Sequence, residues 1–76
     1  MNKPRRIALN KIKEQIEDLR YQLEEILNEE QEAFDNMPEG LQYSERGEKM
    51  EECISALEDA VCGLEDAVDN IDTATI

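Results

Sequence analysis

The sequence contains no histidine and no tryptophan, and its aromatic residues are one phenylalanine and two tyrosines. Histidine is the commonest general base near neutral pH and the commonest metal ligand, so its absence argues against most hydrolytic and metal-dependent chemistry. Paired carboxylates can hydrolyse glycosides, but only where a pocket raises the pKa of one of them. A chain of 76 residues has room for one small domain with little interior. We therefore expect no enzymatic activity, no cofactor and no metal site.

Basic residues are also scarce, because 8 Lys and Arg oppose 20 Asp and Glu and leave a net charge of −12. Direct binding to nucleic acid needs a basic surface, so this function is not expected. No apolar run approaches the roughly 20 residues of a membrane span. Lys11 and Lys13 interrupt the apolar residues behind the basic start, which argues against a signal peptide. Two cysteines make no disulfide framework, so we expect a cytoplasmic protein.

Apolar residues recur in the first half of the chain at alternating steps of three and four. They are Leu9, Ile16 and Leu23 at heptad position a, and Ile12, Leu19 and Ile26 at position d. This pattern predicts a helix over residues 4–36, about 48 Å long. Pro4 suits its first turn. The pattern weakens at Glu30, where Leu27 and Phe34 lie beside it and could replace it.

A second heptad pattern follows and predicts a helix over residues 45–71, with a frayed tail over 72–76. Its members are Met50, Ile54, Leu57, Val61, Leu64, Val68 and Ile71. Ser44 is the expected N-cap. In the connection 37–44, Pro38 disfavours helix before it and Gly40 permits a positive φ. We expect the apolar residues Leu41 and Tyr43 to pack this connection against the helices.

Two long helices joined by a short connection predict an all-α antiparallel hairpin, coiled-coil-like, as a single domain over residues 1–76. Charge favours this direction. Residues 1–13 carry five basic groups and no acid, whereas the last stretch carries acids and no base. Each cluster opposes its own helix dipole, and an antiparallel hairpin lets the two clusters offset one another.

Some apolar residues flank the two heptad patterns, and two helices alone cannot cover them all. They are Leu27, Phe34, Cys53, Ala60 and Ala67. Burial of such side chains favours association, so we predict a homodimer that forms a four-helix bundle. Cys53 should lie at the edge of the core, and Cys62 should face outward.

Acidic doublets repeat about every 10 Å along both predicted helices. They are Glu17, Asp18, Glu24 and Glu25 in the first helix, and Glu51, Glu52, Glu58, Asp59, Glu65 and Asp66 in the second. One interpretation is a solvated surface that keeps a small bundle dispersed. The other is a partner-binding face that imitates the charge of nucleic acid before a basic groove.

The tip of the hairpin is the second candidate for partner binding. Its residues are Phe34, Met37, Leu41, Tyr43 and Arg46. Aromatic and arginine side chains often dominate binding energies, but these residues could equally cap the end of the bundle. The basic start could likewise meet an acidic partner or pair with the acidic end of the second helix.

The stretch from Glu29 to Gln42, followed by Ser44 to Glu48, resembles small acidic proteins of bacteriophages and mobile elements. In those proteins a turn of the form DN-[LM]-P-E-x-L-Q precedes a helix rich in Leu, Ala and Glu. The resemblance implies a phage setting, where small acidic proteins, among them anti-CRISPR proteins, often inhibit a nuclease or another nucleic-acid-binding effector of host defence. It thus favours a non-catalytic inhibitor in the host cytoplasm. The alternative is a structural or regulatory module, such as a phage assembly factor or an antitoxin-like stabiliser.

Overall fold

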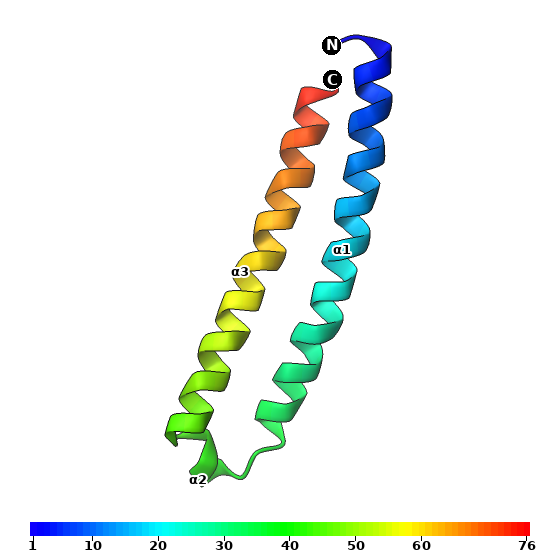
Figure 1. The fold of residues 1–76 in the computed structure, drawn as a ribbon. Coiled ribbons are helices and arrows are strands. Elements are labelled where there is room, and N and C mark those ends of the chain that lie inside the picture. The colour runs from blue at the N-terminus through cyan, green and yellow to red at the C-terminus, as the bar shows by residue number, and fades with distance from the viewer.

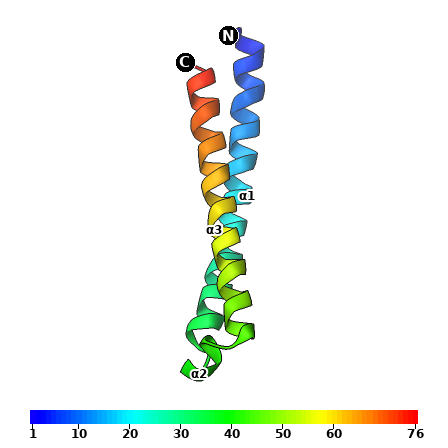
Figure 2. The same cartoon turned by 90° about the vertical axis from the view of Figure 1, so that its left-hand side faces the viewer.

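The protein is a helical hairpin, as described by a computed structural model of residues 1–76. Helix α1 spans Lys3–Asp35, the short helix α2 spans Glu39–Gln42, and α3 spans Glu45–Ala74. Helices α1 and α3 pack side by side in opposite directions (Figure 1), and they cross at a shallow angle (Figure 2). The radius of gyration is 17.2 Å, against about 11 Å for a compact chain of this length. The predicted hairpin of two long helices is confirmed.

Side chains near both helix starts explain where the helices begin. The Asn2 side chain accepts a hydrogen bond from the backbone N–H of Arg5 at 3.0 Å, and Pro4 lies in the first turn of α1. The Ser44 hydroxyl accepts one from the backbone N–H of Gly47, as its role as N-cap predicts. These bonds satisfy N–H groups that a helix start leaves without partners.

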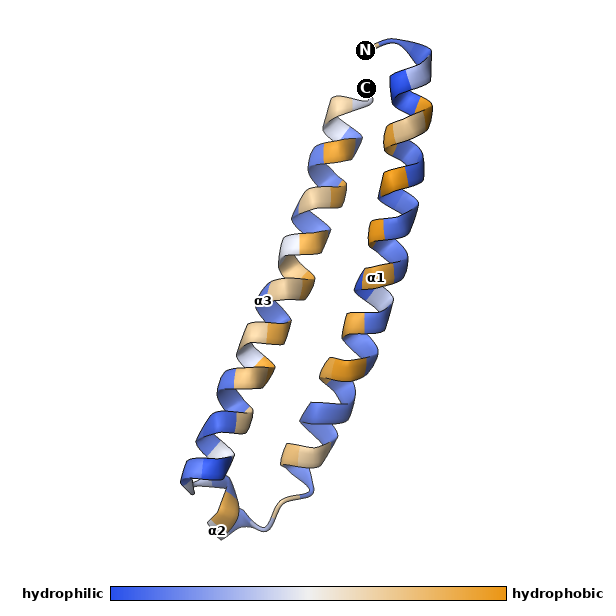
Figure 3. Cartoon of the chain, viewed as in Figure 1, coloured by the Kyte–Doolittle hydropathy of each residue, from blue (hydrophilic) through white to orange (hydrophobic).

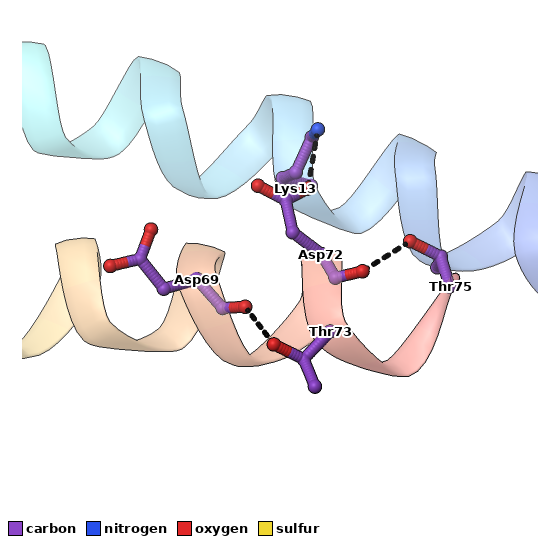
Figure 4. A network of polar contacts seen from close by, with 5 residues as sticks. All are labelled: Lys13, Asp69, Asp72, Thr73 and Thr75. Carbon is purple, nitrogen blue, oxygen red and sulfur yellow. Dashed lines mark hydrogen bonds and ion pairs between the residues drawn. The ribbon is translucent and has the colours of Figure 1, made fainter.

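The C-terminal end of α3 lies further along the chain than expected. The helix continues to Ala74, so the expected end at residue 71 and the frayed tail from residue 72 are wrong over this turn. Asp72 forms an ion pair with Lys13, and the Thr75 hydroxyl donates to the Asp72 carbonyl at 3.1 Å (Figure 4). The contact with α1 therefore stabilises the last turn of α3, which the local sequence alone did not predict to be helical.

The connection is more ordered than the sequence suggests, because it contains α2. Gly40 lies inside this helix and no glycine has a positive φ, so the conformational freedom that Gly40 offers is not used for a turn. The Gln42 amide donates to the carbonyls of Phe34 at 3.0 Å and Met37 at 3.3 Å, and thereby closes the end of α1. The side chains of Leu41 and Tyr43 do not pack against the helices as expected, since they are 49% and 78% exposed.

Gly47 permits a close backbone contact between α2 and α3. A Cβ atom at this position would lie 2.1 Å from the Gln42 carbonyl oxygen and 2.7 Å from that of Leu41. Real Cβ atoms do not approach so closely. A glycine is therefore required where the corner folds onto the first turn of α3.

The interior is small, since only Gly47, Ile54 and Val61 are buried. They belong to one row of α3, spaced seven residues apart, that faces α1. Apolar positions recur along the facing sides of both helices (Figure 3). On α1, the a row is half-buried together with Leu27 and Phe34, whereas the d row is exposed.

Positions a and d, which the heptad pattern places on one stripe, thus differ in their surroundings on α1: the a row faces α3 and the d row faces away from it. Ile12 is 45% exposed, Leu19 53% and Ile26 49%. Leu27 and Phe34, which we expected to remain for a dimer, instead face α3. A single neighbouring helix covers one stripe of its partner, and the apolar stripe of α1 is wider than that.

Candidate functional site

Two ion pairs between the long helices identify one side of the hairpin. Lys13 Nζ lies 2.8 Å from Asp72 Oδ1, and Arg20 Nη1 lies 3.5 Å from Glu65 Oε1. We call the a row of α1 and the row of α3 that contains Ile54 and Val61 the central rows. On each helix, the paired residue follows a residue of the central row by four positions. Residues that follow the central row by three positions must lie on the opposite side, because each residue advances by about 100° around the helix.

The predicted acidic doublets divide between this side and the outer surface. The first member of each doublet lies on the side of the ion pairs, and together these five residues form what we call the acidic groove. They are Glu17, Glu24, Glu51, Glu58 and Glu65. The second members point away from the groove and are exposed without an ion pair or side-chain hydrogen bond. They are Asp18, Glu25, Glu52, Asp59 and Asp66.

Arg20 partly neutralises the half of the groove that lies toward the chain termini. Its guanidinium bonds Glu24 at 2.9 Å, reaches Glu65 at 3.5 Å, and lies 4.8 Å from the centre of the Tyr21 ring. Desolvation acts to lower the pKa of Arg20, but Glu24, Tyr21 and Glu65 outweigh it and raise this pKa. The hydrogen bond to Asp72, aided by its charge, likewise raises the pKa of Lys13.

The other half of the groove, toward the tip, has no such compensation. An open hollow there is lined by Gln31, Phe34, Glu51, Ile54, Ser55 and Glu58. Neither Glu51 nor Glu58 forms an ion pair. The hollow therefore combines two free carboxylates with the edges of a phenylalanine and an isoleucine. It joins one predicted tip residue, Phe34, to the predicted acidic face.

The remaining tip residues differ in their accessibility. Met37 is half-buried, whereas Leu41, Tyr43 and Arg46 are exposed. Much of the tip motif has a structural explanation: Asn36 ends α1, Pro38 starts α2, and Gln42 closes the corner. Only the three exposed side chains remain available to a partner.

Sequence reasoning missed three residues of the hollow, Gln31, Ile54 and Ser55, as site residues. It also missed the structural role of Gln42. The lining of the hollow follows once the pairing of the helices is known, because residues 31 and 34 of α1 lie level with 54 and 51 of α3. No local motif marks them.

The structure gives little support to the remaining candidate sites. Cys53 and Cys62 are both exposed, so the expected place of Cys53 at the edge of the core is wrong. Of the basic residues near the start of the chain, Lys13 alone pairs with the acidic end of α3. No three cysteine or carboxylate side chains converge where they could hold a metal ion. No helix has an apolar stretch that could cross a membrane.

Comparison with known proteins adds no relative. No known protein family matches the chain, and neither a curated protein nor a solved structure shows significant similarity to it.

Proposed function

We propose that this protein is a non-catalytic acidic binding protein that occupies a basic surface of another protein. The observation that supports this function is the acidic groove, in which five glutamates from two helices share one side with Arg20 and Lys13, the two α1 cations that form ion pairs with α3. Such a surface attracts a positively charged cleft over a long range and speeds association with it.

The hollow at the tip end of the groove suits a lysine or arginine side chain. The aliphatic part of such a side chain would lie on Phe34 and Ile54, and its charge would lie between Glu51 and Glu58. Basic clefts that bind nucleic acid are rich in these residues. With the phage resemblance, this chemistry favours a phage-encoded inhibitor of a nucleic-acid-processing defence protein in the host cytoplasm, for instance a nuclease.

A structural or regulatory helical module is the second candidate, such as a phage assembly factor or antitoxin-like stabiliser. The exposed d row of α1 favours it, because exposed apolar rows are typical of helices that associate. Self-association into a dimeric four-helix bundle is part of our proposal in either case. It would leave the acidic groove free for a different partner.

Affinity capture from host lysate, with the bait immobilised through its N-terminus, tests the proposed function. The doublets provide matched baits: Glu51→Lys with Glu58→Lys in the groove, and Glu52→Lys with Asp59→Lys on the outer surface. Both baits change the net charge equally. A captured protein should bind the groove variant at least ten times more weakly than the outer variant, and its affinity should fall as salt rises. Equal losses from both variants would contradict a role for the groove.

The exposed tip is the competing surface, and its own variants distinguish it. Tyr43→Ala and Arg46→Ala remove exposed side chains without touching the packing of the hairpin. Phe34→Ala is less suitable, because Phe34 also packs between the helices and lines the hollow. If either tip variant abolishes capture while the groove variant binds normally, the proposed role of the acidic groove is wrong.

A further inference from the structure

The side of the hairpin opposite the acidic groove is an uncovered apolar face. It consists of the residues that follow the central rows by three positions: Ile12, Leu19 and Ile26 on α1, and Met50, Leu57, Leu64 and Ile71 on α3. The three α1 residues are about half exposed, and the four α3 residues are half-buried. We infer that a second copy of this chain covers this face and runs in the opposite direction, so that each tip lies beside the other copy's termini.

The accessible area of the single chain favours a second copy as the occupant. The hairpin exposes 5723 Å², whereas a compact monomer of this mass exposes about 4,800 Å². The excess is roughly 900 Å² per copy, which corresponds to about 1,800 Å² for a pair and matches a stable interface of standard size.

Charge determines the direction of the second copy. The level of the Arg20–Glu65 ion pair divides the hairpin into two ends. The terminal end, residues 1–20 and 65–76, carries six basic and seven acidic side chains, whereas the tip end, residues 21–64, carries two basic and thirteen acidic ones. Nearly all of the net charge therefore lies at the tip end.

Two parallel copies would place both acidic tip ends side by side. Packed helices lie about 8–10 Å apart, which is close to the Debye length of about 8 Å at physiological salt, so this repulsion would be only partly screened. In the opposite direction, each acidic tip end lies beside a nearly neutral terminal end that carries Lys3, Arg5, Arg6 and Lys11 without ion pairs. Arg5 itself continues the row of Ile12, Leu19 and Ile26 on the apolar face.

This arrangement packs α1 on α1 and α3 on α3 of the second copy. The acidic grooves then face outward on opposite sides of a four-helix bundle. This dimer is the self-association that forms part of the proposed function, but its formation does not depend on a target protein. Purified chain therefore tests it, and failure to capture a target would leave it unaffected.

The first test measures mass by sedimentation equilibrium. We expect a dimer for the natural chain, and at least a tenfold weaker dimer for Leu19→Gln on the apolar face. Ile7→Gln is the matched control, because Ile7 is 56% exposed but lies on the back of α1. Gln is as good a helix former as Ile or Leu, and circular dichroism checks that both variants remain helical.

The second test measures direction and leaves the apolar face unchanged. Spin labels are attached through Tyr43→Cys at the tip, after Cys53→Ser and Cys62→Ser remove the natural thiols. With opposite directions the two labels should lie about 45–60 Å apart, since each is more than 20 Å along the helix from the centre of the pair. Parallel copies would place them within about 25 Å.

The outcomes separate the parts of the inference. A dimer that is weakened by Leu19→Gln but not by Ile7→Gln, with a long distance between labels, supports both the face and the direction. A short distance overturns the direction. A chain that remains monomeric at high micromolar concentration, or a dimer that only Ile7→Gln weakens, overturns the face.

Discussion

Substitution of two glycines of α3 by alanine should change the stability of the hairpin in opposite directions. Gly47 and Gly63 lie in the same helix, and both have ordinary helical backbone. A Cβ atom at residue 63 would have no atom within 4 Å, whereas at residue 47 it would lie 2.1 Å from the Gln42 carbonyl oxygen and 2.6 Å from its carbon. Both substitutions gain helix propensity, less at Gly47 because it lies in the first turn, and the main difference between them is this contact.

The magnitudes follow from the two contributions. Gly63→Ala should raise the free energy of unfolding by about 0.5–1 kcal/mol, because alanine loses less backbone entropy in a helix. In Gly47→Ala the smaller gain is opposed by an overlap with backbone atoms, which cannot rotate away as a side chain would. Overpacking of this kind costs about 1–3 kcal/mol, and the severity of the overlap places it in the upper half of this range. We expect a net loss of about 1–2 kcal/mol.

Thermal unfolding followed by circular dichroism at one protein concentration measures both effects. For a domain of this size, 1 kcal/mol corresponds to about 4–8 °C in Tm. Gly63→Ala should therefore raise the Tm by about 5 °C, and Gly47→Ala should lower it by about 5–15 °C. A fixed concentration matters because association makes the Tm depend on it. If Gly47→Ala were as stable as Gly63→Ala, the close contact between α2 and α3 would be wrong.

Three further predictions concern the corner and the ion pair of the terminal end. Gly40→Ala should raise the free energy of unfolding by about 0.5–1 kcal/mol in a urea titration, because Gly40 has a helical backbone and open space around it; a loss would indicate a positive φ instead. Gln42→Glu keeps the length of the side chain but removes the donor to two carbonyls, and should lower the same free energy by about 1 kcal/mol, whereas no change would show that these bonds are absent. The raised pKa of Lys13 means that its pair with Asp72 contributes stability below the ordinary value of 10.5 and loses it as pH rises through the higher folded value. The stability difference between the natural chain and Lys13→Gln should therefore shrink as pH rises above about 10.5, and a constant difference would refute the pairing.

The helices and their direction could be predicted from the residues alone. Apolar side chains at steps of three and four produce an amphipathic helix wherever no proline interrupts it, so the bounds of α1 agree within one residue at each end. Ser44 marked the start of α3 for the same local reason, since a hydroxyl at the N-cap bonds the first free N–H groups. The opposite charges of the two chain ends favoured an antiparallel hairpin, and Lys13 and Asp72 from these two ends form an ion pair in the structure.

Tertiary structure decided which side of each helix would be covered. A heptad pattern places positions a and d on one stripe of the helix. It does not determine which side of that stripe a single neighbouring helix will cover. In the hairpin, the neighbour is centred between the a row and the row that contains Leu27, so Ile12, Leu19 and Ile26 remain outside. The position of the neighbouring helix also placed Glu51 and Glu58 in the groove, and Glu52 and Asp59 on the outer surface. Adjacent residues on a helix point about 100° apart, so only the position of the second helix can assign them to different surfaces.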